Sequence, residues 1–337
     1  MRNVLAVVPC LDEERNIARV LRGLLAEEAV ALIVVADGGS RDATRAIVSE
    51  FALDTRRVVL LDNPDRIQSA GINRAVARHG AGLDWLVRID AHCDYPRAYV
   101  SRLLEAARAR EAGSVVVAMR TEAKSGFAAG VAAAQNSRLG TGGSAHRVGG
   151  EGAYVDHGHH ALMRIAAFRR AGGYCENMVC NEDAELDVRL RAQGEQIWLE
   201  PSATIAYHPR SSPGALFRQY FRYGMGRAMT VRRHRERMRA RQMLPLLVAP
   251  AVLALAMAPL VPLIGPLLAL PALAWAALCL GWGVALGLKA GRADVALAGP
   301  AAMIMHFAWS AGFWRRLLQD FLRPDAPGSE PLLPFAR

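Results

Sequence analysis

The sequence lacks the features of a secreted protein held together by disulfides. Its 337 residues contain five cysteines, an odd number, and no two of them form a C-x-x-C pair. The apolar run Val4–Val8 is too short for the core of a signal peptide, and acidic residues follow it at 12–14. Scattered single cysteines favour a reducing compartment. We therefore interpret Val4–Val8 as a first β-strand and expect the N-terminal part of the chain in the cytosol.

Charge is missing from one long stretch and is almost entirely positive in the stretch before it. No charged residue occurs between Met243 and Leu288. Residues 210–241 hold ten arginines and one acid, Glu236, and this accounts for nearly all of the formal net charge of +10. A domain that binds nucleic acid would distribute its positive charge differently. A basic segment beside an apolar block is typical of a membrane surface, so the pattern predicts a membrane partner and no nucleic acid.

The apolar tail is long enough to cross a bilayer. A hydrocarbon core of about 30 Å needs roughly 20 apolar residues per helix, and the uncharged block can hold spans at about 244–264 and 267–288. Lys289 and Arg292 would then lie on the same side as the basic segment, as the positive-inside rule requires. A further apolar stretch, 295–313, is either a third span or a re-entrant or surface helix. The alternative for the whole tail is a buried, soluble helical domain.

Short apolar runs alternate with amphipathic stretches near the N-terminus. The pattern predicts strands and helices in turn. The strands are 4–8, 31–36, 57–61 and 85–89, and the helices are 16–25, 44–51 and 68–77. Continuously apolar strands between helices indicate an α/β fold with a Rossmann-like, mostly parallel sheet. Ligands bind beyond the carboxyl ends of such strands, so we expect the polar clusters at 9–13, 37–40 and 90–92 to share one crevice.

These patterns divide the chain into four parts. We predict an α/β domain at 1–213, an Arg-rich helix and linker at 214–242, a membrane region at 243–322 and a disordered tail at 323–337. Apolar residues recur at helical spacing within 215–229, which is typical of an amphipathic helix lying in the membrane interface.

A series of motifs follows in order between Val4 and Arg227. They are V-P-C-L-D-E-E at 8–14, A-D-G-G-S-R-D-A-T at 36–44, N-P-D-R-I-Q-S-A-G-I-N at 63–73, D-A-H at 90–92, N-E-D-A-E-L at 181–186 and Q-Y-F-R-Y at 219–223. Together they resemble the GT-A-fold glycosyltransferases of family 2. Within that family the chain is most similar to the succinoglycan-type exopolysaccharide transferases, which also carry D-A-H and a short membrane tail.

The resemblance implies an inverting sugar transfer. The donor would be a nucleotide diphosphate sugar, a UDP-sugar before others, and the acceptor a lipid-linked or polysaccharide glycan. The apolar tail, the basic segment before it and the short N-terminal apolar run predict an inner-membrane, multi-pass protein with its catalytic domain in the cytoplasm. A processive polysaccharide synthase of the same family remains open. A sugar nucleotidyltransferase would carry a glycine-rich, basic first loop, and here that loop is acidic.

The loops after the first strands are the expected donor site. A carboxylate at Asp37 can accept the imide N–H of uracil or guanine, and Gly38 lets the backbone approach closely. Glu13 would line the same pocket, and Arg66 would meet the diphosphate. The full donor set is Pro9, Glu13, Asp37, Gly38, Arg66 and Asp90. The alternative is structural, because acids and hydroxyl residues before a helix commonly cap it.

Asp90 and His92 are the expected metal ligands, in the place where most relatives carry D-x-D. A divalent cation, Mn²⁺ or Mg²⁺, would stabilise the departing diphosphate, and imidazole suits Mn²⁺ better than Mg²⁺. The pair resembles the D-x-H of polypeptide N-acetylgalactosaminyltransferases, which implies a later histidine as a third ligand. His208 is the candidate for it, and Asp94 is an alternative ligand.

By resemblance, Asp183 is the general base that takes the proton of the acceptor hydroxyl, with Glu182 beside it in the acceptor site. The alternative is an acid that stabilises the start of the helix predicted at 184–192. The histidine-rich segment 156–160 could bind zinc, but its alternating pattern favours contacts to the wall of the site or to the acceptor.

The motif at 219–223 resembles the Q-x-x-R-W of processive synthases. This implies that Gln219, Arg222 and Tyr223 contact the acceptor and the leaving group. Tyrosine replaces the tryptophan of that motif, and the alternative is that these residues belong to the interfacial helix alone.

Overall fold

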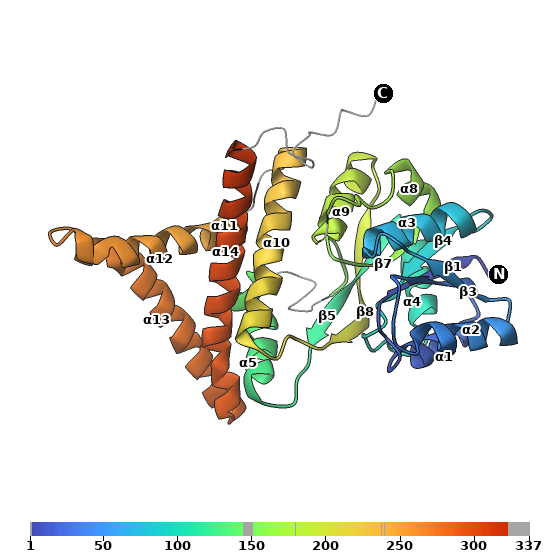
Figure 1. Cartoon of the computed structure of the whole chain (residues 1–337), viewed down its shortest axis with the longest axis horizontal. Helices are drawn as coiled ribbons and strands as arrows, with labels where there is room; N and C mark the ends of the chain where they lie inside the picture. The colour runs from blue at the N-terminus through green and yellow to red at the C-terminus, as the bar shows by residue number, and fades with distance from the viewer. Residues whose placement is uncertain (1, 144–150, 179, 237, 239, 323–337) are drawn as a thin grey trace. The chain divides into compact units, whose positions relative to one another are not determined.

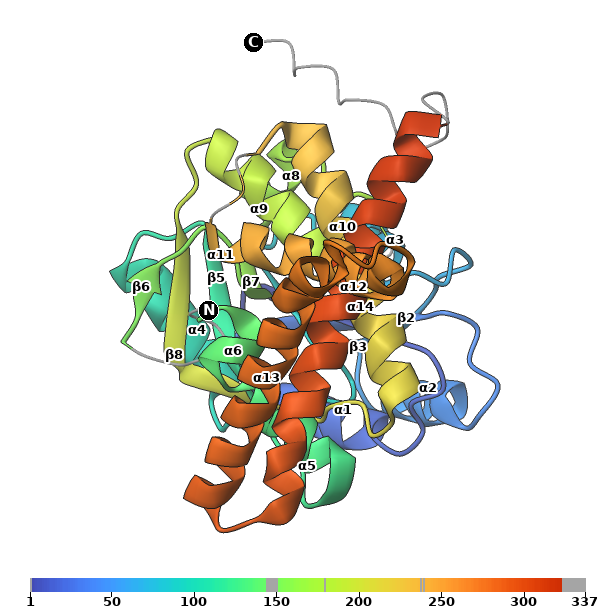
Figure 2. The ribbon, with the colours of Figure 1, turned by 90° about the vertical axis from the view of Figure 1, so that its left-hand side faces the viewer.

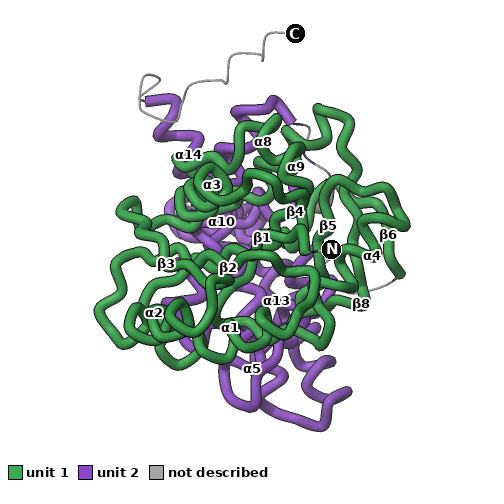
Figure 3. Tube along the Cα trace, turned by 90° about the vertical axis from the view of Figure 1, so that its right-hand side faces the viewer, with its two compact units in different colours: residues 1–119, 149–206 green, residues 120–148, 207–337 purple. Residues whose placement is uncertain are grey.

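The structure is a computed structural model that describes residues 2–143, 151–178, 180–236, 238 and 240–322. The chain forms two compact units (Figure 3). Unit 1 comprises residues 1–119 and 149–206, and unit 2 comprises 120–148 and 207–337. The tail predicted to be disordered, 323–337, lies outside the described residues.

Unit 1 is built on a mixed sheet. Its strand order is β3-β2-β1-β4-β7-β5-β8-β6. The first four strands in this order run parallel to one another, as the sequence predicts, whereas β7 pairs antiparallel with both β4 and β5. The strands are β1 (Val4–Cys10), β2 (Val30–Asp37), β3 (Val58–Asp62), β4 (Trp85–Arg88), β5 (Ser114–Thr121), β6 (Ala153–Tyr154), β7 (His159–Arg164) and β8 (Ile197–Tyr207).

Helices cover both faces of this sheet (Figure 1). On one face lie α3 (Gln68–His79), α8 (Ile165–Arg170) and α9 (Glu182–Ala192), and on the other lie α1 (Ile17–Leu25), α2 (Thr44–Asp54) and α4 (Tyr99–Ala109). The core beneath α3, α8 and α9 includes Val7, Ile72, Phe168 and Leu186, all at most 2% exposed. Because the strands are buried on both faces, they read as continuous apolar runs.

Unit 2 is helical (Figure 2). Among its described residues the α-helices are α5 (Gly126–Gln135), α6 (Arg138–Thr141), α10 (Pro213–His234), α11 (Ala240–Met243), α12 (Val248–Met257), α13 (Gly265–Ala290) and α14 (Ala298–Leu322). Residues 120–148, expected within the α/β domain, group with the C-terminal helices. The reason is that α5 is apolar and buries Val131 and Ala134 against Ala301 and Met305 of α14.

Glycines allow α10 and α14 to touch along their backbones (Figure 1). A Cβ on Gly224 of α10 would lie 2.0 Å from the carbonyl oxygen of Trp309, and one on Gly312 of α14 would lie 2.0 Å from that of Phe221. Toward the C-terminal end of α14, the buried Asp320 pairs with Arg232 of α10 at 3.1 Å and with Arg316 at 2.9 Å. Helix α10 begins at Pro213, where the Ser212 hydroxyl accepts the Ala215 amide as an N-cap.

Two helices are long and apolar enough to cross a membrane, and they correct the predicted spans. They are Gly265–Ala290 and Ala293–Leu322, which contain the whole of the predicted segments 267–288 and 295–313. The predicted span 244–264 is not among them, because the apolar helical stretch there, Leu244–Leu260, is shorter. It breaks into α12 and the 3₁₀ turns η1 (Leu244–Leu247) and η2 (Ala258–Leu260), where prolines remove backbone donors.

The histidine in the last apolar stretch is fully hydrogen-bonded. His306 Nε2 lies 2.8 Å from the carbonyl oxygen of Leu139. Its Nδ1 lies 3.2 Å from Nε1 of Trp275 on α13, which donates to it. A neutral imidazole that donates from Nε2 and accepts at Nδ1 satisfies both contacts. The residue therefore joins α14 to α13 and to the end of α6.

The glycine contact gives a direct test of helix packing in unit 2. Gly224→Ala forces backbone against backbone, so we expect it to destabilise the protein by about 1–3 kcal/mol. Gly281→Ala is the matched control on α13. A Cβ there meets nothing within 4 Å, and alanine favours the helix by about 0.5–1 kcal/mol. Thermal unfolding in detergent measures both, and equal melting temperatures for the two variants would contradict the packing argument.

Candidate active site

The predicted donor loop is held by the side chain of Asp37, at the end of β2. This carboxylate accepts the backbone amides of Gly39 at 3.0 Å and Ser40 at 3.2 Å, and the Ser40 hydroxyl at 2.5 Å. Arg45 pairs with it at 2.6 Å. Burial acts to raise the pKa of Asp37, but the hydrogen bonds from Ser40 and Arg45 leave it below its usual range. The buried Asp37 is thus an anion that shapes the glycine turn.

The turn at Gly38 and Gly39 has a cation beside it. Gly39 has φ +87°, a backbone conformation that favours glycine. A Cβ at Gly39 would lie 3.7 Å from a terminal guanidinium nitrogen of Arg66, and one at Gly38 would lie 3.6 Å from the Arg66 Cα. Arg66 is exposed, and Pro9 is half-buried at the end of β1. The structure therefore brings the predicted donor residues of β1, β2 and the loop before α3 to one edge of the sheet.

Glu13 and His92 lie next to each other at the same edge. Nδ1 of His92 is 3.3 Å from one carboxylate oxygen of Glu13, and the other oxygen accepts the Asn16 amide at 2.8 Å. The side chain of His92 is 58% exposed, whereas that of Glu13 is 17% exposed. The imidazole is therefore accessible from solvent.

A buried arginine joins the donor side of the site to the proposed base. Arg88 lies on β4 and is 6% exposed. Its guanidinium is 3.3 Å from Asp90, 3.4 Å from Glu182 and 2.5 Å from Asp183. Gln68 at the start of α3 donates to the same Asp90 oxygen at 3.1 Å. Strand β4 and the first turn of α9 thereby bring three carboxyl groups around one cation.

This arrangement gives the three acids different pKa values. Burial acts to raise the pKa of Asp90 and of Asp183, but Arg88 and nearby histidines hold both well ionised, and Asp183 lies far below its usual range. Burial and the neighbouring Asp183 raise the pKa of Glu182 to about 7. At neutral pH the cluster therefore holds two carboxylates and one group that is partly protonated.

Sequence reasoning missed three residues of this cluster, Arg88, Tyr174 and Asp187, whereas His159 and His160 fall in the segment 156–160 that it assigned to the wall of the site or to acceptor contacts. His159 Nε2 lies 3.5 Å from Asp90, and its Nδ1 lies 3.8 Å from Asp183. The sequence could have identified Arg88, because a charged residue in an otherwise apolar, buried strand requires a partner of opposite charge. The segment 156–160 was interpreted as a wall of the site, and nothing in the sequence links it to Asp187.

The other predicted residues belong to unit 2. His208 is exposed and follows β8. Gln219, Arg222 and Tyr223 lie on α10, and the Gln219 amide nitrogen donates to the Tyr207 hydroxyl at 2.9 Å and to the Tyr223 hydroxyl at 3.0 Å. The amide oxygen of Gln219 is buried and accepts no hydrogen bond from any residue that the structure describes.

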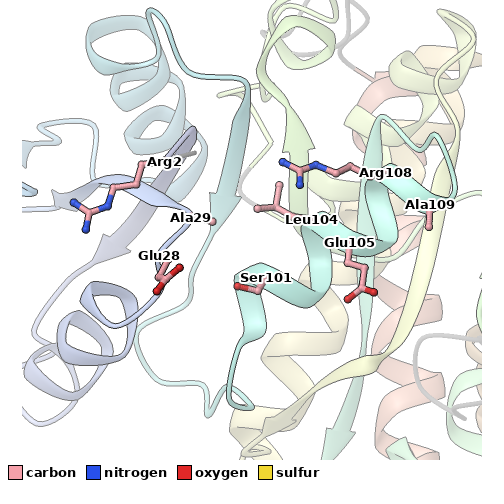
Figure 4. Close-up of a pocket in the computed structure, with 8 residues that line it drawn as sticks. All are labelled: Arg2, Glu28, Ala29, Ser101, Leu104, Glu105, Arg108 and Ala109. Atoms are coloured by element: carbon pink, nitrogen blue, oxygen red, sulfur yellow. The ribbon is translucent and has the colours of Figure 1, made fainter.

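Within the described part of the chain, no group of three or more His, Cys, Asp and Glu side chains is placed so that it could hold a metal ion alone. A cavity of about 730 Å³ lies elsewhere in unit 1 (Figure 4). Arg2 and Ala29, which line it, precede β1 and β2. It therefore opens at the amino ends of these strands, whereas the acids gather at the carboxyl ends.

Comparison with known proteins gives both a family and a near relative. The model of "Glycosyl transferase family 2" matches residues 5–172. The succinoglycan biosynthesis protein ExoA of Rhizobium meliloti (strain 1021) is 50% identical over 321 residues, which cover 95% of this chain and 96% of that protein. Similarity therefore extends through both units.

The fold is also similar to that of a solved mannosyltransferase. PcManGT from Pyrobaculum calidifontis, in complex with GDP-Man and Mn²⁺, superposes with a TM-score of 0.58. The match covers 94% of this chain and 87% of that one at 19% identity. This supports the GT-A-like architecture, a mixed sheet with helices on both faces.

The raised pKa of Glu182 predicts a pH-dependent stability. Unfolded Glu182 loses its proton near pH 4.5 and folded Glu182 near pH 7. The folded state therefore loses up to about 3 kcal/mol of stability as pH rises through this window. Thermal unfolding of Glu182→Gln between pH 5 and 8 should lack this loss, whereas the exposed control Glu50→Gln should retain it. Parallel curves for wild type and Glu182→Gln would contradict the prediction.

Proposed function

The chain belongs to glycosyl transferase family 2, and from this we propose that it is an inverting glycosyltransferase of exopolysaccharide synthesis. It transfers a sugar from a nucleotide diphosphate donor to a lipid-linked or polysaccharide acceptor. A UDP-sugar is the favoured donor. The observation that carries the proposal is the Arg88 cluster, which brings Asp90 and Asp183 to one buried cation. The name of the 50% identical relative supports the exopolysaccharide class.

We propose that the donor nucleotide binds where β1 and β2 end. Pro9, Glu13 and the turn at Gly38 would form the base pocket, with Asp37 either accepting the base or holding the turn for it. The exposed Arg66 guanidinium beside Gly39 suits the diphosphate, since arginine offers several donors to phosphate oxygens. The mannosyltransferase of similar fold is in complex with GDP-Man, which supports a nucleotide-sugar donor.

The residues present fit a divalent metal. Asp90 is an ionised carboxylate, and His92 two residues later is an exposed imidazole. These two side chains would hold the cation, with diphosphate oxygens completing its ligands. When bound, Mn²⁺ or Mg²⁺ supplies Lewis-acid stabilisation of the charge that develops on the leaving diphosphate. Asp90 is oriented for this role by Gln68 and Arg88.

The acceptor side of the proposal centres on Asp183. Its carboxylate lies in the first turn of α9, and it would accept the proton of the acceptor hydroxyl as that oxygen attacks the anomeric carbon. A base of low pKa is sufficient, because the hydroxyl becomes acidic only as its bond to the sugar forms. Attack from the face opposite the leaving diphosphate gives inversion. Glu182, with a pKa of about 7, would lie beside the incoming hydroxyl.

We further propose that α10 contributes to the acceptor site and that α13 and α14 attach the protein to the cell membrane, with the catalytic unit in the cytoplasm. The unpaired, buried amide oxygen of Gln219 supports a ligand role for this residue, together with Arg222 and Tyr223. The exposed leucines of α13, among them Leu267, Leu278 and Leu288, support contact with lipid. A lipid-linked acceptor would then be presented where the enzyme is attached.

Replacement of the proposed base tests the mechanism. Asp183→Asn keeps the size of the side chain but cannot accept the proton, so we expect sugar transfer to fall by at least about 100-fold. Donor binding, measured by calorimetry with a UDP-sugar, should persist because it uses the other edge of the cluster. Asp65→Asn, at an exposed surface pair, is the control and should transfer normally. Normal transfer by Asp183→Asn would refute the base assignment.

The assignment of His92 as a metal ligand predicts that replacing it changes the preference of the enzyme for Mn²⁺ over Mg²⁺. Chelation with EDTA should abolish transfer by the wild type, and Mn²⁺ should restore more activity than Mg²⁺, because imidazole is a poor ligand for Mg²⁺. His92→Asp restores two carboxylates and should narrow this difference by roughly tenfold. Asp94→Asn, which weakens the ion pair with Arg19, tests the alternative ligand and should behave as the wild type if His92 binds the metal. An unchanged metal preference in His92→Asp would exclude His92 as a ligand.

A further inference from the structure

A second, fully buried charge pair lies behind Asp183. His160 on β7 has a wholly buried side chain, and its Nε2 is 2.7 Å from Oδ1 of Asp187. Its Nδ1 is 2.6 Å from the Tyr174 hydroxyl and 3.3 Å from Oδ1 of Asp183. Asp183 and Asp187 are one helical turn apart on α9, so one imidazole lies against both.

Asp187 explains why a histidine is found here. Its side chain is 0% exposed, and its second oxygen accepts the amide of Gly158 at 3.3 Å. A buried carboxylate requires a counter-charge, since desolvation of an unpaired ion costs several kcal/mol. His160 is the basic group in contact with it. The pair is therefore stable when the imidazole carries a proton on each nitrogen.

The groups around His160 agree with this charge state. Burial acts to lower the pKa of His160, but Asp187, Tyr174 and Asp183 raise it well above its ordinary value. The remaining charged or titratable groups at this place, Arg88 on β4, Glu182 on α9 and His159 on β7, contact Asp183 or its neighbours. One Asp183 oxygen thus faces two cations, Arg88 at 2.5 Å and His160 at 3.3 Å.

The other Asp183 oxygen has a different environment. Oδ2 lies 3.8 Å from Nδ1 of His159, beyond hydrogen-bonding distance. With Oδ1 held by two cations, the carboxylate cannot rotate freely, and Oδ2 is the oxygen left for a substrate proton. The contacts of Oδ1 with Arg88 and His160 thereby decide that Oδ2 is the oxygen that accepts the proton.

We propose that His160, kept as a cation by Asp187, is a positioning residue that holds Oδ1 of Asp183 so that Oδ2 receives the proton of the acceptor hydroxyl. This inference rests on the proposed role of Asp183 as the base. Arg88 keeps its charge at every working pH, whereas His160 titrates. The contribution of His160 can therefore be separated from that of Arg88 by pH.

Asp187→Asn is the decisive variant, because it preserves shape and removes the counter-charge of His160. The pKa of His160 should fall, so the imidazole becomes neutral at a lower pH than in the wild type. We expect kcat to fall by roughly 10- to 100-fold at pH 8. The pH at which kcat falls on the alkaline side of its profile should decrease by at least about one pH unit. KM for the donor should stay unchanged. Asp65→Asn again serves as the control.

A wild-type kcat–pH profile in Asp187→Asn, with kcat unchanged, would overturn the proposal. The proposal would also be overturned if Asp187→Asn lowered only the yield of folded protein and left kcat per folded molecule normal. Asp187 would then have a structural role only. Parallel assays of Asp183→Asn separate the two levels. If Asp183→Asn transferred sugar normally, Asp183 would not be the base and the proposed mechanism would fall. If Asp183→Asn were inactive while Asp187→Asn was unaffected, Asp183 would remain the base and only the role of His160 would be refuted.

The charge state of His160 can also be measured without a variant. In protein labelled with ¹⁵N-histidine, one of the nine histidines should still show a doubly protonated imidazole at pH 8, where exposed histidines are neutral. A spectrum with no imidazolium signal above pH 7.5 would overturn the proposal even if Asp187→Asn did not fold.

Discussion

A guanidinium buried in the sheet is the interaction on which the site depends. Arg88 is the last residue of β4, between the buried Val87 and Ile89, and carries a charge that requires compensation at this depth. Asp90 from the end of the same strand, and Glu182 and Asp183 from the first turn of α9, provide it. The pairing joins α9 to the sheet and gathers around one buried cation the carboxylates to which we assign sugar transfer.

The same cluster gives chemically similar groups different protonation. Asp183 faces Arg88 and His160 and stays ionised, whereas Glu182 beside it has a pKa near 7 because it is buried next to that charge. Environment rather than residue type decides which acid holds a proton, as in other enzymes that use two carboxyl groups. His160 and Asp187 extend this pattern one layer deeper, with a second cation between two carboxylates.

Unit 2 is stabilised by a different balance. Its helices approach through glycines at 224 and 312 and through small residues of α5 and α14, where backbone contact replaces side-chain interdigitation. The buried histidine of α14 is paired, since His306 contacts the carbonyl of Leu139 and the indole of Trp275. Large apolar side chains on α12 and α13 remain exposed. Close packing inside and apolar residues outside suit a lipid environment, in which every polar group must be satisfied internally.

The sequence by itself determined the parallel strands β1 to β4, the loops at their carboxyl ends and the uncharged C-terminal block, because each follows from local periodicity or composition. Family membership also followed from ordered motifs. Tertiary structure alone decided that α5 belongs with the C-terminal helices and that His160 meets Asp187. These contacts join residues far apart in the chain, and their geometry depends on how helices pack, which no local pattern encodes.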